Sequence, residues 1–186
     1  MQFFMDVTRG RIRMRRKVIK QSAAGWLAMV LLAGLWVSPM TAWADAWALN
    51  PAEDFQQLAK QAKQDKQPIA IYFNRVRCGA CEKLKDAAIL PMIENGLLDG
   101  YVHMVEIRVD AKDETIRDFY GEPVDNAFFQ ELYNVTTFPT IVFVDADGSE
   151  IGKRMVNSGA YDYVPYYLTE RINQALEEMG NDKRME

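Results

Sequence analysis

The chain has 186 residues, and its 26 Asp and Glu residues outnumber its 22 Lys and Arg residues, so its formal net charge is −4. Binding to nucleic acid or to anionic membranes depends on a basic surface, and this acidic balance argues against both functions. The length allows one domain with a substantial hydrophobic core, in addition to a targeting segment.

The first 44 residues have the three parts of a secretory signal peptide. After a basic leader, a charge-free stretch runs from Gln21 to Ala44, and Pro39 interrupts it shortly before the small residues Ala42 and Ala44. We therefore predict cleavage after Ala44 and export to the periplasm. The alternative is an uncleaved membrane anchor, because the apolar stretch is nearly long enough to span a bilayer. The basic residues of the leader are Arg9, Arg11, Arg13, Arg15, Arg16, Lys17 and Lys20.

Two details of export stay open. Arg15 and Arg16 loosely resemble a twin-arginine export signal, although ordinary Sec export is favoured. Translation can start at Met1 or at Met14, and the second start leaves a compact signal peptide. Seven of the 22 basic and one of the 26 acidic residues lie in the leader, so residues 45–186 carry 15 basic and 25 acidic residues and a formal net charge of −10.

After a short lead over residues 45–49, helices and strands alternate in one domain over residues 50–179. Its first helix is expected to start with Asn50 as N-cap and Pro51 at the first helical position. The tail over residues 180–186 is expected to be frayed. Apolar patterning and turn residues predict these further elements: a strand over 67–73, a loop over 74–77, a helix from the cysteines to Leu90 that Pro91 kinks, a strand over 101–109, a polar turn or loop over 111–124, a helix over 126–133, a strand over 141–144, a hairpin turn over 145–148, its return strand over 150–156, and a helix over 162–179. This order favours an α/β fold with a central mixed sheet flanked by helices.

The two cysteines of the chain, Cys78 and Cys81, follow directly after the first predicted strand and its loop. Two thiols with this spacing on the first turn of a helix can be alternately reduced and bridged, and the helix dipole makes a thiol at that end more acidic. Because the thiolate attacks disulfides, the pair predicts thiol–disulfide exchange, with Cys78 as nucleophile and Cys81 as resolving thiol. Arg77 adds a positive charge that favours the thiolate of Cys78.

Two other uses of the cysteine pair are less well supported. A zinc site needs four ligands, and His103 is the single histidine of the chain. A purely structural disulfide that closes so small a loop adds little stability. We therefore expect no metal and no dissociable cofactor, because the redox-active Cys78–Cys81 pair carries the electrons itself.

A second motif, Thr137 to Thr140, places Phe138 and Pro139 immediately before the strand expected over residues 141–144. With this motif, the cysteine pair and the order of elements, residues 50–178 resemble the thioredoxin superfamily, in particular the exported single-domain thioredoxin-like proteins of bacteria. The resemblance implies a cis bond before Pro139 that faces the cysteines, and a backbone at Phe138 that pairs with an extended substrate. The alternative is a trans proline, which is the default for most prolines.

The sequence departs from thioredoxins around the cysteines. Arg77 stands where thioredoxins have a tryptophan, and Gly79-Ala80 replaces their Gly-Pro. Tyr72 replaces a buried aspartate near the resolving thiol, and the lysine of the next strand corresponds to Glu106. We expect the Glu106 carboxylate to assist proton transfer at Cys81.

The sequence thus predicts an exported thiol–disulfide oxidoreductase with protein thiols and disulfides as substrates, a membrane redox partner that recycles it, and a monomeric state. The resemblance favours a reductase, because Gly79 matches thioredoxins and because oxidants of the superfamily commonly carry a large helical insertion that this sequence lacks. Arg77 favours an oxidant, because a stabilised thiolate makes the disulfide more oxidising. The alternative is a redox-inert peptide-binding module that uses the groove beside Pro139 and keeps its disulfide for structure.

Overall fold

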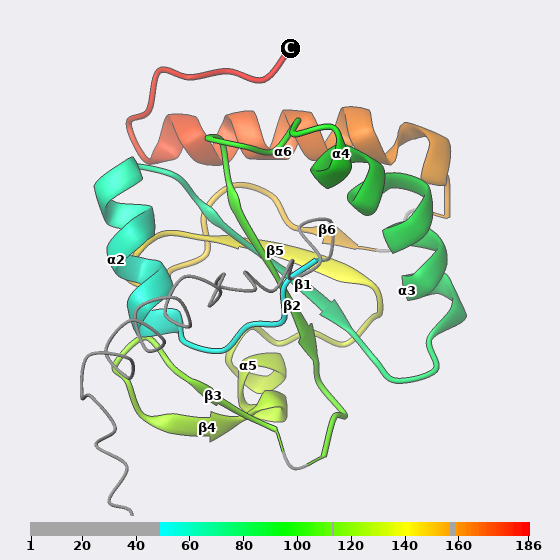
Figure 1. Cartoon of the computed structure of the whole chain (residues 1–186), viewed down its shortest axis with the longest axis vertical. Coiled ribbons are helices and arrows are strands. Elements are labelled where there is room, and N and C mark those ends of the chain that lie inside the picture. Colours follow the sequence, from blue (N-terminus) through cyan, green and yellow to red (C-terminus); the bar gives the residue numbers. More distant parts are fainter. Residues whose placement is uncertain (1–48, 113, 157–158) are drawn as a thin grey trace, which may run out of the picture. The chain divides into compact units, whose positions relative to one another are not determined.

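The computed structural model describes residues 49–112, 114–156 and 159–186 (Figure 1). The predicted signal peptide, its cleavage after Ala44 and the two candidate start positions lie outside the described residues, as does all of the lead except Leu49. None of the helices in the described ranges is both long and apolar enough to cross a bilayer.

A mixed β-sheet forms the centre of the described domain. Parallel pairing joins β1 to β2, and antiparallel pairing joins β1 to β5 and β5 to β6, in the spatial order β2-β1-β5-β6. The prediction of a central mixed sheet is therefore confirmed. The strands are β1 (Ile69–Asn74), β2 (His103–Arg108), β5 (Thr140–Val144) and β6 (Met155–Val156).

Helices cover both faces of this sheet (Figure 1). Because successive side chains of a strand point to opposite faces, the buried run of β1 supplies both sides. Ala70 and Tyr72 pack in one core cluster, whereas Ile69, Ile71 and Phe73 pack in the other. The first cluster lies under α3 (Gly79–Leu84), the π-helical segment η1 (Lys85–Ile89), α4 (Leu90–Glu94) and α6 (Val164–Glu178), and the second under α2 (Phe55–Asp65) and α5 (Asn126–Leu132).

The helix that follows the cysteines changes its winding before Pro91. The N–H of Leu90 donates to the carbonyl of Lys85, five residues earlier, at the end of η1. Proline has no N–H and crowds the preceding turn, so a local change in winding is expected there. The helix that was expected to change at Pro91 therefore does so through a π-helical turn directly before it.

Two predicted segments differ from the structure. The first helix begins after Asp54, whose side chain caps it by accepting from the N–H of Gln57 (2.8 Å), and not at Asn50. The backbone around Pro51 instead pairs with Glu106 at the edge of β2. Residues 111–124 contain strand β3 (Thr115–Arg117) and the first residues of β4 (Pro123–Asp125), which form a hairpin in place of the expected loop.

The hairpin that follows β5 has a shorter return strand than the predicted range, 150–156. After the turn, Glu150 makes an isolated bridge to Val144, and β6 contains Met155 and Val156 alone. Gly152 lies between these two contacts with φ of +63°, a left-handed conformation that interrupts an extended strand. The terminal helix agrees closely with the prediction, because the 3-10 turn η2 (Tyr161–Tyr163) leads directly into α6.

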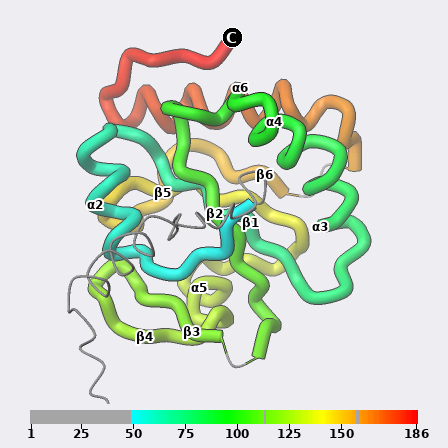
Figure 2. Tube along the Cα trace, viewed as in Figure 1, coloured from blue at the N-terminus to red at the C-terminus, as the bar shows by residue number. Residues whose placement is uncertain are grey.

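The tail over residues 180–186 is docked on the domain, so the prediction of a frayed tail is wrong. Asn173 of α6 exchanges two hydrogen bonds with the backbone of Met185 (2.7 and 3.0 Å), and the Met185 side chain is buried in the first core cluster. The side chain of Asn181 donates to the carbonyl of Lys66, at the end of α2 (2.7 Å). Figure 2 shows the tail lying back along α6.

Candidate active site

The two cysteines form a disulfide at the N-terminus of α3. Cys78 is the N-cap residue, and its Sγ accepts the N–H of Cys81 at 3.3 Å. Cys78 is half-buried, whereas Cys81 is fully buried. This difference in exposure agrees with the predicted roles, in which a substrate reaches Cys78 first and Cys81 acts from inside.

The peptide bond between Phe138 and Pro139 is cis, which is the isomer that the resemblance to the thioredoxin superfamily implies. Phe138 packs against the core cluster that contains Cys81 and has Cys78 at its edge. The hydroxyl of Thr140 donates to the carbonyl of Thr137 (2.7 Å), so a hydrogen bond spans the cis bond. The structure therefore brings the predicted substrate-binding motif and the cysteine pair to one place.

Beneath the disulfide, the side chain of Tyr72 is fully buried, and its hydroxyl donates to the carbonyl of Cys81 (2.8 Å). The same carbonyl accepts the N–H of Lys85. Burial raises the pKa of Tyr72 well above its usual value, and the nearby Glu106 carboxylate raises it further. The phenol at this position is therefore neutral.

The Glu106 carboxylate lies next to Tyr72 in the register of β1 and β2. Its side chain is 11% exposed, and it accepts hydrogen bonds from the Nζ of Lys85 (3.1 Å) and from the amide of Asn74. Lys85 follows Cys81 by four residues, so both lie on one face of the helix. The structure thus gathers a carboxylate, an ammonium group and a phenol around the helical turn that carries Cys81.

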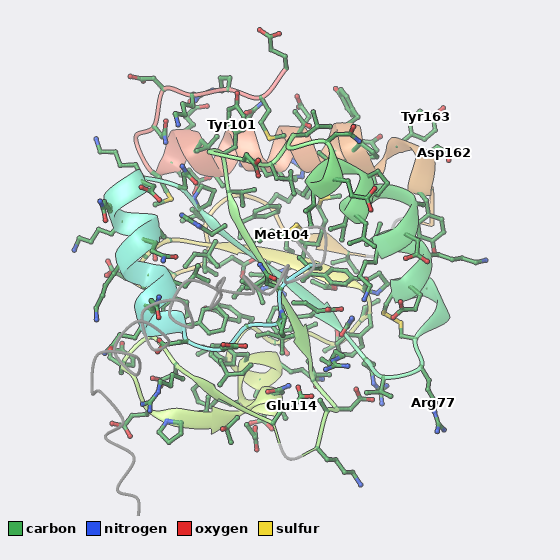
Figure 3. All side chains as sticks on the ribbon, in the orientation of Figure 1. Arg77, Tyr101, Met104, Glu114, Asp162 and Tyr163 are labelled. Atoms are coloured by element: carbon green, nitrogen blue, oxygen red, sulfur yellow. A yellow bond between two sulfur atoms is a disulfide. The ribbon has the colours of Figure 1, made fainter. Side chains whose placement is uncertain are left out.

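The loop before Cys78 contains two arginines with different environments. Arg77 has φ of 61°, in the left-handed region, and its exposed side chain points away from the domain (Figure 3). Arg75 instead pairs with Asp110 at the end of β2 (3.5 Å) and lies over the ring of Phe138 (5.6 Å to the centroid). The stabilisation of the Cys78 thiolate by Arg77 stays a prediction.

Sequence reasoning assigned no role to four polar groups of this site: the Tyr72 hydroxyl, the Asn74 amide, the Lys85 ammonium and the Asp110 carboxylate. Lys85 could have been found from the sequence, because it follows Cys81 by four residues and so lies on the same face of the helix. The other three depend on which strands become neighbours. Across the described ranges, no group of three or more His, Cys, Asp or Glu residues is placed to hold a metal, and His103 lies against Asp65 (3.4 Å).

The family model described as thioredoxin-like domain matches residues 55–176, which is most of the described domain. The chain belongs to the thioredoxin-like domain family. This thioredoxin-like protein is 26% identical over 102 residues to the disulfide bond reductase DsbH of Chlamydia pneumoniae. That match covers 54% of the chain and 60% of the relative, which is less than two thirds of the relative's length.

Solved structures agree with the family assignment. The structure of a DsbH oxidoreductase is 25% identical to this thioredoxin-like protein, with a TM-score of 0.51, and the match covers 71% of this chain and 88% of that one. The predicted α/β thioredoxin fold is therefore confirmed.

Proposed function

We propose that this thioredoxin-like protein is an exported thiol–disulfide oxidoreductase that reduces disulfides of protein substrates in the periplasm. The proposal rests on one arrangement: a half-buried Cys78 at a helix N-terminus, bonded to a fully buried Cys81, with a cis Phe138–Pro139 bond in the same cluster. The name of the Chlamydia relative, a disulfide bond reductase, supports the reducing direction.

The two cysteines account for the whole electron transfer. In the reduced protein, the Cys78 thiolate attacks one sulfur of a substrate disulfide, forms a mixed disulfide and releases one substrate thiolate, which takes up a proton. Cys81 then loses its proton and attacks the Sγ of Cys78, which releases the second substrate thiolate. The protein ends with a Cys78–Cys81 disulfide, and the substrate gains two electrons and two protons, so no dissociable cofactor takes part.

Glu106 is the group that we propose to receive the proton of Cys81. Burial disfavours the charged form of a thiol, so the resolving step needs a nearby base. Lys85 and Asn74 hold the Glu106 carboxylate in place. We expect Glu106→Gln to slow the release of the mixed disulfide about tenfold and to change its pH dependence, which stopped-flow measurement of the resolving step detects.

Glu114→Gln is the matched control for Glu106→Gln, because it removes a more exposed carboxylate, which pairs with Arg108 at the end of β2. Unchanged kinetics and an unchanged pH profile in Glu106→Gln would remove Glu106 from the mechanism.

Trapping experiments test the exchange itself. Cys81→Ala leaves the nucleophile but no resolving thiol, so it should accumulate mixed disulfides with substrate proteins, visible by non-reducing electrophoresis. Cys78→Ser should form none. If Cys78→Ser keeps full partner binding and phenotype, the protein is a binding module and the proposed activity is wrong.

Export and recycling complete the proposal. A signal peptide over residues 1–44 takes the chain to the periplasm, where a membrane redox partner reduces the Cys78–Cys81 disulfide and the protein acts as a monomer. Cell fractionation tests the location, and mixed disulfides of Cys81→Ala with a membrane protein identify the partner.

A further inference from the structure

Three segments that are distant in sequence meet beside the active-site disulfide. Residues 75–77 connect β1 to Cys78, Asp110 follows β2, and Phe138 precedes the cis proline. One carboxylate oxygen of Asp110 accepts the backbone N–H of Val76 (2.7 Å), and the other lies 3.5 Å from the Nε of Arg75. The guanidinium carbon of Arg75 lies 5.6 Å from the centroid of the Phe138 ring.

We propose that Arg75 and Asp110 are positioning residues that set the affinity for extended protein substrates by fixing Phe138 relative to Cys78. This inference rests on the proposed function, because it concerns how the same site binds its substrate. Neither residue takes part in the exchange of sulfur bonds, so both act through the residues that they hold.

The Asp110 side chain fixes the loop before the nucleophile. A carboxylate that accepts a backbone N–H forms a charge-assisted hydrogen bond, which is stronger than one between neutral groups. This bond holds Val76 directly before Arg77, whose left-handed backbone carries a steric cost for a residue other than glycine. Asp110 thereby stabilises the loop conformation that delivers Cys78 to the start of α3.

The Arg75 side chain connects that loop to Phe138. A guanidinium over an aromatic face is attracted by the negative face of the ring, and the Asp110 pair orients the guanidinium. Phe138 also packs against both core clusters, so its ring is held from the inside by the core and from the outside by Arg75. Both segments that a bound peptide must touch, the one before Cys78 and the one before Pro139, are thus linked by one pair of charges.

The exposure of these groups indicates an effect on substrate binding more than on folding. The Arg75 side chain is 56% exposed, and ion pairs at exposed sites contribute little to the free energy of unfolding. A protein substrate that lies along Phe138 would contact the region that the pair orders. A small disulfide needs access to Cys78 alone.

The test compares two disulfide probes in the full-length protein, driven by dithiothreitol: insulin as a protein substrate and hydroxyethyl disulfide as a small one. We expect Arg75→Gln to raise the KM for insulin about two- to fivefold, with kcat within twofold, and to leave the reaction with hydroxyethyl disulfide unchanged. Arg75→Lys, which keeps the charge, should recover part of the loss. In a Phe138→Leu background, Arg75→Gln should have no further effect on KM, because Arg75 acts through Phe138.

Arg108→Gln is the matched control for Arg75→Gln. It breaks an exposed ion pair with Glu114 (3.1 Å) at the end of β2, the strand that Asp110 follows. The inference is overturned if Arg108→Gln raises the KM equally, if Arg75→Gln leaves KM unchanged, or if it slows both probes alike. If instead the proposed function is wrong, the wild-type protein itself reduces neither insulin nor hydroxyethyl disulfide. This result is distinct from any change in KM between variants.

Discussion

Where thioredoxins bury an aspartate near the resolving cysteine, this protein buries the neutral phenol of Tyr72. An aspartate there can accept a proton, whereas a phenol with a raised pKa remains a hydrogen-bond donor. The carboxylate comes instead from Glu106 on the neighbouring strand, paired with Lys85. At the scale of single residues, two side chains therefore replace the aspartate: Tyr72 holds the backbone of Cys81, and Glu106 carries the carboxylate that we propose as the proton acceptor.

Tyr72→Phe removes the hydrogen bond to the carbonyl of Cys81, which keeps the N–H of Lys85 as a partner. We expect a loss of about 1 kcal/mol in the free energy of unfolding, measured by urea denaturation, and a change in the rate of disulfide reduction. Tyr133→Phe is the matched control, because this buried phenol donates to the carbonyl of Gly148 (2.9 Å), which belongs to the turn after β5. The control should lose similar stability and keep the wild-type rate. Equal rates in both variants would contradict a positioning role for Tyr72.

The half-buried imidazole of His103 makes stability depend on pH. Burial lowers the pKa of His103 below its ordinary value of 6.5, and Asp65 opposes this only in part. The unfolded chain therefore binds the proton more readily, so the contribution of His103 to stability is complete above about pH 6.5 and is lost as the pH falls below it. Urea denaturation of His103→Gln between pH 5 and 8, which is about one and a half units on either side of that value, should show a flatter dependence of stability on pH than the wild type.

Asp65→Asn provides the opposite change, because it removes the carboxylate that favours protonated His103 (3.4 Å). Its stability should fall more steeply than that of the wild type below pH 6.5. A profile of His103→Gln that matches the wild type would show that other groups control the acid response.

At the scale of elements, buried apolar runs predicted their strands well, since β1 and β5 lie within one or two residues of the expected ranges. Errors occurred where tertiary contacts overrode local preference. The side chain of Asn50 suits a helix N-cap, yet the Asn50 carbonyl accepts the N–H of Glu106 (2.9 Å), which extends the edge of the sheet. Within the segment expected to be a polar turn or loop, Asp118 accepts the N–H groups of Tyr120 and Glu122 (2.9 Å each), but the pairing of β3 with β4 on either side of this turn was not predicted.

The docked tail gives a prediction at the same scale. Deletion of residues 181–186 removes the buried Met185 side chain and its two hydrogen bonds with Asn173. We expect a loss of about 1–3 kcal/mol in the free energy of unfolding, with an unchanged rate of disulfide reduction, because apolar burial outweighs the cost of ordering these few residues. Deletion of the exposed Glu186 alone is the control and should have little effect. A full-length and a truncated chain of equal stability would show that the tail does not contribute.

At the scale of the whole molecule, the sequence was sufficient for the fold and for the sulfur chemistry, but not for the polar groups around the sulfur atoms. Cys78, Cys81 and the cis bond at Pro139 are local motifs, and their positions after β1 and before β5 make them neighbours in this fold. In contrast, Asp110 reaches Val76 across 34 residues of sequence, and Asn74 reaches Glu106 across 32. Such pairs depend on strand register and loop geometry, which a single sequence does not reveal.

The equilibrium reduction potential of the Cys78–Cys81 pair, measured in defined thiol buffers, decides whether this protein can reduce the disulfides of other proteins. We predict a potential near the thioredoxin value of about −270 mV, at which the reduced pair donates electrons to protein disulfides. A potential near about −120 mV would contradict a reductase, because the pair would then act as a disulfide donor. A pair that cannot be cycled in any of these buffers would contradict disulfide exchange altogether.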